Sequence, residues 1–221
     1  MRFLRENGLS IALFGLFAFS VTGQYLAGWM EHNEDQRMHG RPVVTAIEYA
    51  GEGHFWEALF ENWESEFLQM SAYILLTVFL FQKGASDSKR IDAAERVDRI
   101  LPKHLQPDDA PWPVRKGGAL VRTIYENSLS LTLVLLFAAS FVMHGVAGAA
   151  AYNDELSEHG REQITILEYM KTSTFWFESF QNWQSEFLSI GVLVVLSIFL
   201  RQKGSPESKP VDAPHRETGK G

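Results

Sequence analysis

The sequence predicts an all-α, polytopic membrane protein with four transmembrane helices, arranged as two parallel tandem two-helix repeats with short, amphipathic extracytoplasmic helices. Three observations predict this fold: apolar residues gathered in long blocks, a repeat that covers most of the chain, and basic residues concentrated in particular connecting segments. The chain has 221 residues, of which 46% are hydrophobic and 21% are charged. Because the charges lie between the apolar blocks, the blocks can suit a lipid environment although the average composition is moderate.

Four apolar blocks are expected to cross the bilayer as helices. The first and third run for about 20 residues without a charge, the length that roughly 30 Å of hydrocarbon requires of a helix. The second and fourth are shorter, but each follows an aromatic-rich stretch with helical spacing, and a combined helix would be roughly 42 Å long. The predicted spans are residues 9–30, 55–82, 129–151 and 175–201.

A tandem repeat relates the two halves of the chain. A shift of 120 residues aligns residues 5–89 with 125–209 without a gap, and 35 of the 85 aligned positions are identical. The first apolar block could pass for a secretory signal, but its copy lies in mid-chain, so both are interpreted as permanent anchors. The predicted organisation is repeat 1 (1–89), a linker with a short helix (90–124), repeat 2 (125–204) and a disordered tail (205–221).

The linker and tail are expected to carry little regular structure. A short charged helix is predicted from Asp87 to Leu105, and the run QPDDAPWPVRKGG that follows is expected to break any regular structure. The tail from Ser205 is polar and contains prolines, which predicts disorder. Its basic residues could bind anionic lipid headgroups, or act only as topology signals, which is the favoured interpretation.

Lysine and arginine are concentrated in the linker and the tail, whereas the hairpins between paired spans hold few of them and many acids. This distribution sets the orientation of membrane proteins and predicts that both termini and the linker are cytoplasmic. The second repeat then begins on the same side as the first, which disfavours the inverted-repeat class of transporter. The net charge of −7 is less informative, because its sign changes along the chain.

The phrase Asn-Trp-x-Ser-Glu-Phe-Leu occurs at residues 62–68 and 182–188, each time at the start of a shorter apolar block. Helical spacing places Asn62 and Glu66 on one polar face, and Asn182 and Glu186 on the equivalent face of the second copy. A separate face is aromatic. Its tryptophans are interpreted as anchors at the bilayer interface, with an aromatic ligand cage as the alternative. They are Trp56, Trp63, Trp176 and Trp183.

The longer blocks share a pattern of small and polar residues, Ser20-Gln24-Gly28 in the first and Ser140-His144-Gly148 in the third. The spacing puts each set on one helix face, where small residues allow close helix packing and polar ones bond across the contact. Packing is the favoured interpretation. The alternative is a polar path across the membrane. Its predicted lining is Gln24, Asn62, Glu66, His144, Asn182 and Glu186.

The two hairpins repeat an asparagine, two acids and a His-Gly-Arg triplet. A capped turn is the favoured interpretation, because Gly40 and Gly160 suit a helix C-terminus and a Thr-x-x-Glu capping box follows each. A divalent cation site is the less favoured alternative, because carboxylates and imidazoles are suitable ligands. Its ligands would be Asp35, His39, Glu155 and His159.

The chain has no cysteine, which excludes disulfides, thiolate metal sites and cysteine nucleophiles. It also shows no phosphate loop or nucleophile motif. We therefore predict a non-enzymatic membrane protein with a structural, protective or partner-binding role and no cofactor. Its expected partners are the lipid bilayer and further copies of itself, without nucleic acid. The alternative is a small channel or transporter formed by a homo-oligomer, and a metal-dependent enzyme is least favoured.

The phrase Phe-Trp-x3-Phe-x-Asn-Trp-x-Ser-Glu-Phe-Leu at 55–68 and 175–188, with Glu-Asn-x-Leu-Ser at 6–10 and 126–130, resembles an uncharacterised family of small bacterial integral membrane proteins. The likeness covers nearly the whole chain apart from the linker and tail. The resemblance implies a location in the bacterial inner membrane, with several passes. It supplies no activity and no catalytic residue.

Overall fold

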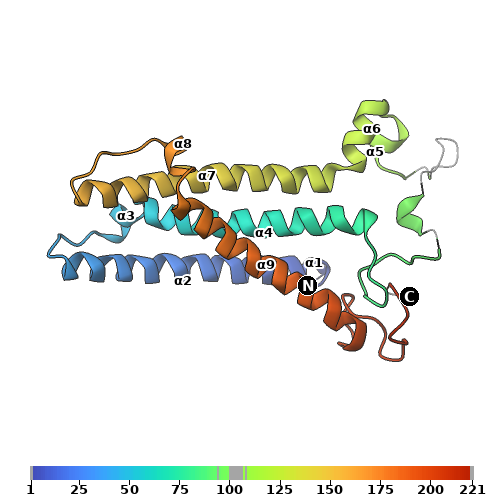
Figure 1. The fold of residues 1–221 in the computed structure, drawn as a ribbon. Coiled ribbons are helices and arrows are strands. Elements are labelled where there is room, and N and C mark those ends of the chain that lie inside the picture. The colour runs from blue at the N-terminus through green and yellow to red at the C-terminus, as the bar shows by residue number, and fades with distance from the viewer. Residues whose placement is uncertain (1, 94, 100–106, 108, 220–221) are drawn as a thin grey trace. The chain divides into compact units, whose positions relative to one another are not determined.

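In the computed structural model the chain is all-helical, without strands, over the residues that the structure describes, which are all except 1, 94, 100–106, 108 and 220–221. Four helices of this described chain are long (Figure 1): α2 (Gly8–Met38), α4 (Gly53–Phe79), α7 (Ser128–Glu158) and α9 (Ser173–Phe199). The short elements are α1 (Arg2–Glu6), α3 (Ala46–Tyr49), the 3-10 turn η1 (Arg96–Asp98), α5 (Trp112–Arg115), α6 (Ala119–Glu126) and α8 (Ile166–Tyr169).

Each long helix covers most or all of one predicted span, and α2 and α7 continue beyond the predicted ends at residues 30 and 151. By length and composition, α2, α7 and α9 are apolar enough to cross a membrane. Helix α4 is as long as α9, at 27 residues, but four glutamates in its first half lower its hydropathy. The structure therefore shows an all-α protein with three candidate membrane-spanning helices, and the fourth span remains a prediction.

The chain divides into two compact units. Unit 1 comprises residues 1–59 and 143–170, and unit 2 comprises residues 60–142 and 171–221. Helices α4 and α7 each contribute residues to both units. The division by contacts therefore differs from the predicted division into repeats, because each end of a long helix packs with its own set of neighbours.

Unit 1 contains two hairpin turns of the same design. Helices α2 and α7 end at glycines with positive φ, 69° at Gly40 and 64° at Gly160, a conformation that favours glycine. The following residue, Arg41 or Arg161, donates its backbone N–H to a carbonyl five residues earlier, at 2.8 and 2.9 Å. These are Schellman-type helix ends. The capped-turn interpretation is confirmed at this end of each hairpin.

The start of each hairpin helix is also as predicted. Thr45 is the N-cap residue of α3, and Thr165 is that of α8. In both cases the threonine hydroxyl accepts a hydrogen bond from the backbone N–H of the glutamate three residues on. The glutamate carboxylate accepts in return from the threonine N–H, at 2.7 Å in each copy. Both capping boxes are complete, so the sequence signal for these short helices is confirmed.

One asparagine fastens each hairpin to its long helix. The Asn33 side chain of α2 donates to the Val44 carbonyl at 2.8 Å and accepts from the Val44 N–H at 2.7 Å. Asn153 of α7 makes the same pair of bonds with Ile164, at 2.9 and 2.8 Å. A side chain that satisfies both backbone groups of one residue replaces the missing secondary-structure partner of that residue.

One buried tyrosine completes each hairpin. Tyr49 and Tyr169 are each 1% exposed. Their hydroxyls lie against Gly28 of α2 and Gly148 of α7, where an added Cβ would collide with them. The two glycines were expected to allow close packing of membrane helices. They instead leave room for the tyrosines of α3 and α8, so each glycine packs against its hairpin.

Helices α4 and α9 end in matching loops, both in unit 2. The backbone N–H of Gln82 donates to the Ser88 hydroxyl at 2.8 Å, and that of Gln202 donates to Ser208 at 2.9 Å. A glycine with positive φ lies two residues after each glutamine. Each loop is thus held by a serine side chain that satisfies the backbone beyond the end of the helix.

The helix predicted from Asp87 to Leu105 is not found in the described part of that range. Residues 87–93 form turns and bends, η1 supplies a single 3-10 turn, and residues 94 and 100–106 lie outside the described residues. The physical reason is competition from side chains. The Glu95 carboxylate accepts from the Arg90 N–H at 2.7 Å, so these residues bond locally instead of continuing a helix.

One further expectation is corrected. The run QPDDAPWPVRKGG contains the short helix α5, whose first turn holds Pro113, a position that proline tolerates. The disorder expected of the tail stays a prediction, and its described residues form turns and bends. Lys209, 2% exposed, donates to the carbonyls of Pro214, His215 and Glu217 at 3.4, 3.1 and 2.9 Å. The Lys209 ammonium therefore holds these turns of the tail together.

Candidate functional site

The repeated Asn-Trp-x-Ser-Glu-Phe-Leu motif forms a polar contact between α4 and α9 in unit 2. The Asn182 amide donates to the Glu61 carboxylate, and Trp183 Nε1 donates to Glu64 Oε1 at 2.8 Å. Glu64 is 0% exposed. Because a buried carboxylate is costly without hydrogen bonds, the indole donor stabilises this helix pair.

The two copies of the motif have different roles in this contact. The first copy supplies the acceptor Glu64, the residue directly before that copy supplies the acceptor Glu61, and the second copy supplies the donors. At the positions equivalent to these glutamates, the second repeat has Gln181 and Gln184. Both glutamines are exposed.

The aromatic face predicted for the second copy exists on α9. The rings of Trp176, Phe180 and Trp183 neighbour one another, with centroids 5.4 to 6.3 Å apart. Trp176 and its counterpart Trp56 are 38% and 40% exposed, as anchors at a bilayer interface would be. Trp183 and Trp63 are half-buried, and the indole N–H of Trp183 is directed to Glu64 instead of to a headgroup.

The six residues predicted to line a polar path occupy three environments. Gln24, Asn62 and Glu66 are exposed, Asn182 and Glu186 are half-buried, and His144 is fully buried. The structure brings two of them together, since Glu66 lies close enough to Glu186 for the carboxylates to repel each other. The buried glutamate of the first motif is Glu64, which sequence reasoning did not select.

His144 belongs to a buried polar cluster in unit 1, which also contains Glu57 of α4 and Tyr169 of α8. The Tyr169 hydroxyl donates to Glu57 Oε1 at 2.9 Å. Ligand atoms of Glu57 and His144 lie within 4.8 Å of each other, and the His144 and Tyr169 side chains are 0% and 1% exposed. An imidazole beside a carboxylate can share a proton with it, or provide two ligands to a cation.

The small-polar patterns of α2 and α7 also differ in environment. Ser140, His144 and Gly148 are buried on α7, whereas Ser20 and Gln24 are exposed on α2. The packing interpretation therefore fits the second copy of the pattern. In the first copy Gly28 is covered by Tyr49, whereas Ser20 and Gln24 have no comparable cover within the described residues.

An acidic cavity of about 520 Å³ lies at the hairpin ends of α2 and α7 in unit 1. Asp35 and Glu155, two of the four predicted metal ligands, line it. His39 and His159 do not. Each places Nδ1 within hydrogen-bonding distance of a carbonyl of its own helix, 3.0 Å from Asp35 O and 2.9 Å from Glu155 O.

Two other histidines line this cavity. The ring centroids of His32 and His54 lie 6.5 Å apart. The acidic residues that line the cavity with them are Glu52 and residues of α2 and α7. Carboxylates and imidazoles together could attract a divalent cation. Of the four residues selected in the acidic hairpins, Asp35 and Glu155 line this cavity, and a cation site here stays a prediction.

The repeat comparison explains why these residues were missed. It directs attention to shared positions, whereas His32, His54 and Glu57 differ from their counterparts Tyr152, Thr174 and Phe177. An ionisable side chain whose counterpart is neutral or apolar was the signal that could have found them. Such a residue marks a place where the two halves have diverged.

The fold and these sites define an all-helical protein whose three long apolar helices suggest a membrane protein. The chain belongs to the family described as a domain of unknown function (DUF6766), whose model matches residues 1–220. The resemblance to an uncharacterised family is confirmed in that respect. No curated protein and no solved structure matches the chain.

Proposed function

We propose that the protein is a non-enzymatic, four-span protein of the bacterial inner membrane that acts through packing with lipid and with further copies of itself. The observation that supports this most directly is the apolar surface of the long helices. Phe14 of α2, Leu135 of α7 and Leu193 of α9 are 73%, 69% and 51% exposed. Continuous apolar surface of this kind is unfavourable in water and suits hydrocarbon.

Helix α4 supports a fourth span. At about 1.5 Å per residue its 27 residues extend roughly 40 Å, more than the roughly 30 Å of a hydrocarbon core. Its second half exposes Leu76, Val78 and Phe79, at 50%, 48% and 74%. Two of the glutamates in its first half accept hydrogen bonds from α9, which lowers the cost of bringing them near lipid.

The remaining parts of the proposal rest on the sequence. The family resemblance supports a bacterial inner membrane, and the lysines and arginines of the linker and tail support cytoplasmic termini. The lack of any nucleophile or phosphate-loop motif supports a role without catalysis. We infer no cofactor and no nucleic-acid partner.

Cysteine labelling tests the four-span topology, because the chain has no native cysteine. Single cysteines would replace Met38 and Glu162 in the hairpins, and Arg99 and Lys203 in the linker and tail. In intact cells, a membrane-impermeant thiol reagent should label both hairpin positions, and the other two only after lysis. If α4 does not cross, Met38→Cys and Arg99→Cys should instead react from the same side, which would refute the topology.

A second candidate function, a polar path in a homo-oligomer, is favoured by the exposure of Gln24, Asn62 and Glu66. Polar side chains on membrane helices rarely face lipid, since they are costly there without a partner. A second copy of the chain could cover the exposed face of α2, as protein covers its counterpart on α7. The covered face could then be dry packing or a wetted path.

Thiol accessibility separates these two outcomes. Cysteines at Gln24, Asn62 and Glu66 would be probed in membranes with a small water-soluble thiol reagent, beside controls at the exposed apolar positions Phe14 and Leu76. Labelling of the three polar positions with protection of the controls supports a path. Protection of all five positions supports packing and removes the channel from consideration.

A further inference from the structure

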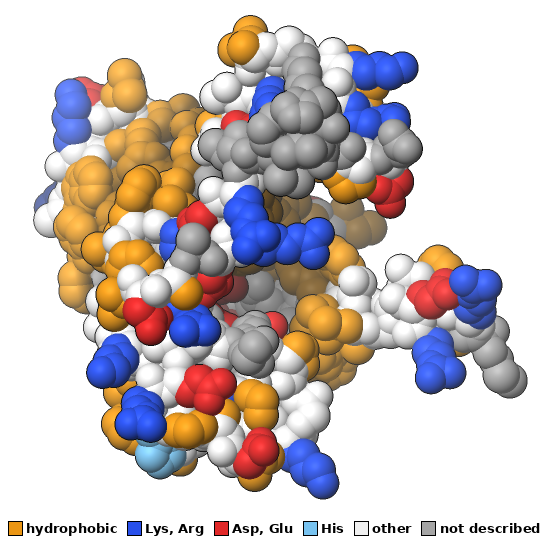
Figure 2. Space-filling view, turned by 90° about the vertical axis from the view of Figure 1, so that its right-hand side faces the viewer, with side chains coloured by type: hydrophobic (Ala, Val, Ile, Leu, Met, Phe, Trp, Pro, Cys, Tyr) orange, Lys and Arg blue, Asp and Glu red, His pale blue; other side chains and the backbone are white. Residues whose placement is uncertain are grey.

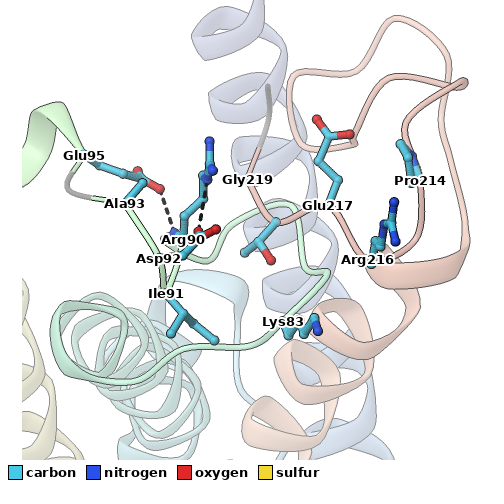
Figure 3. A pocket seen from close by; sticks show the side chains of 11 residues that line it. Lys83, Arg90, Ile91, Asp92, Ala93, Glu95, Pro214, Arg216, Glu217 and Gly219 are labelled. Carbon is cyan, nitrogen blue, oxygen red and sulfur yellow. Dashed lines mark hydrogen bonds and ion pairs between the residues drawn. The ribbon is translucent and has the colours of Figure 1, made fainter.

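A pocket in unit 2, beyond the ends of α4 and α9, is used by neither proposal. It has a volume of about 900 Å³ and lies between the chain that follows α4 and the last part of the tail. Figure 3 shows Arg90, Asp92 and Glu95 on one side of it, Pro214 and Arg216 on the other, and Lys83 below them. Because the candidate span α9 ends at Phe199, the pocket lies where lipid headgroups would be found.

The pocket is held together by defined contacts. The Gly84 N–H donates to the Thr218 hydroxyl at 2.9 Å, and the Gly219 N–H donates to the Ala85 carbonyl at 3.0 Å. Lys209 holds the same part of the tail by donating a hydrogen bond to the Glu217 carbonyl at 2.9 Å. These bonds join the end of the first predicted repeat to the tail, so the two sides of the pocket keep a set separation.

Three basic residues line the pocket, and two of them have their charge available. Arg90 lies 3.5 Å from the Asp92 carboxylate, and its backbone N–H bonds to Glu95. Lys83 and Arg216 are exposed and form no ion pair with any residue that the structure describes. Figure 2, which shows the face that lies on the right in Figure 1, shows lysine and arginine side chains interspersed with aspartate and glutamate.

We propose that this pocket binds a single phosphate group, carried by an anionic lipid headgroup or by a small soluble phosphate ester, with Lys83 and Arg216 as its cationic contacts. Ammonium and guanidinium groups are the usual protein partners of phosphate. Acidic side chains also line the pocket, at Asp92, Glu95 and Glu217. They repel a polyanion, so the lining fits one phosphate better than nucleic acid. The position beside a candidate span favours the lipid as the source.

Native mass spectrometry of the full chain in detergent tests the proposal. The probes are short-chain phosphatidylglycerol and soluble glycerol 3-phosphate, titrated against the wild type and a Lys83→Gln/Arg216→Gln variant. Each lost charge should weaken binding by on the order of fivefold. The matched control is Lys203→Gln, which changes the repeat counterpart of Lys83 in an exposed loop outside this pocket. It should bind like the wild type.

The outcomes separate the two sources of phosphate. Loss of phosphatidylglycerol binding in the double variant, with no binding of glycerol 3-phosphate to the wild type, supports a lipid ligand. Binding of both probes with the same dependence on Lys83 and Arg216 supports a soluble phosphate ester. Binding that survives the double substitution, or falls equally in Lys203→Gln, overturns the proposal. A Lys83→Arg variant, expected to retain binding, excludes a folding defect as the cause of a loss.

Discussion

Two glycines show how single residues position the hairpins. Gly28 and Gly148 lie on the long helices of unit 1 beneath the hydroxyls of Tyr49 and Tyr169. At Gly148 an added Cβ would lie 2.5 Å from the Tyr169 hydroxyl and 2.6 Å from Glu57 Oε1. One hydrogen atom in place of a side chain therefore gives the tyrosine its access to the carboxylate.

We expect Gly148→Ala to destabilise the protein by roughly 1 to 3 kcal/mol, because the new methyl group overpacks a site with no room for it. Thermal unfolding in detergent, followed by tryptophan fluorescence, would show a lower midpoint. Gly15→Ala is the matched control, since Gly15 also lies within a long helix but has nothing within 4 Å of an added Cβ. Equal midpoints for the two variants would contradict the assigned role of Gly148.

Glu48 carries a testable pH dependence. The backbone N–H of Thr45, and to a smaller extent its hydroxyl, hold the pKa of the Glu48 carboxyl below its usual value of 4.5. A lowered folded-state pKa means that this stabilisation of α3 is fully present above about pH 4.5 and is lost as the pH falls through the folded pKa. Carbon-13 NMR of the labelled carboxyl in micelles would measure it.

A Thr45→Ala variant provides the comparison for Glu48. It loses the hydroxyl but keeps the backbone N–H that makes the larger contribution. The Glu48 pKa should therefore rise part of the way toward its usual value. A wild-type Glu48 that titrates at or above that value would show that the capping box does not persist in solution.

In unit 2, side-chain hydrogen bonds join α4 to α9 and hold the turns of the tail. The two copies of the repeated motif contact each other between α4 and α9. Carboxylates of α4 accept hydrogen bonds from an indole and an amide of α9. The loops that follow these helices have the same serine-to-backbone bond. The tail then returns to the first of the two loops.

We expect Trp183→Phe to cost roughly 1 to 3 kcal/mol, since it removes a donor from the fully buried Glu64. Trp176→Phe is the control, because it changes a neighbouring ring of the same aromatic face that makes no hydrogen bond to Glu64. Combining Trp183→Phe with Glu64→Leu should cost less than the sum of the single variants. Simple additivity in denaturation midpoints would argue against the contact.

Lys209→Met tests the fold of the tail. Loss of three charge-assisted bonds should loosen residues 214–217 and raise the rate of cleavage after Glu217 by a glutamate-specific protease, by about tenfold for each 1.4 kcal/mol lost. Lys203→Met keeps the tail contacts and should cleave like the wild type. An unchanged rate for Lys209→Met would mean that the tail is open in the native protein.

For the molecule as a whole, exposed polar residues on an apolar helix point to self-association. We expect native mass spectrometry in mild detergent to show multiples of the 25.1 kDa chain. Gln24→Leu should weaken the assembly by about 0.6 to 2 kcal/mol, the range for one polar contact between membrane helices. Thr22→Leu, on another face of α2, should leave it unchanged. A monomer at all concentrations would remove the homo-oligomer from the proposal.

The long helices and the capped hairpin turns followed from the amino-acid order, because their signals are local. The apolar blocks define the helices themselves. The helix ends are marked by Gly40 and Gly160 after the last turn, and by Thr45 and Thr165 three residues before a glutamate. The helix predicted from Asp87 was wrong over residues 87–93 for the converse reason. The structure there depends on the bond that Glu95 accepts, and the turns of the tail depend on the bonds that Lys209 donates, which composition does not reveal.

The environment of each polar side chain could be known only from packing. Glu64 and Glu66 are two residues apart on one helix, and both fit an apolar helix end, but the first is fully buried and the second exposed. Similarly, His144 is covered while its counterpart Gln24 is not. Helical periodicity assigns residues to faces, and which face meets a partner depends on neighbours that are distant in the chain. For that reason the order of residues established the helices and their ends, and the folded arrangement established which carboxylates and imidazoles they enclose.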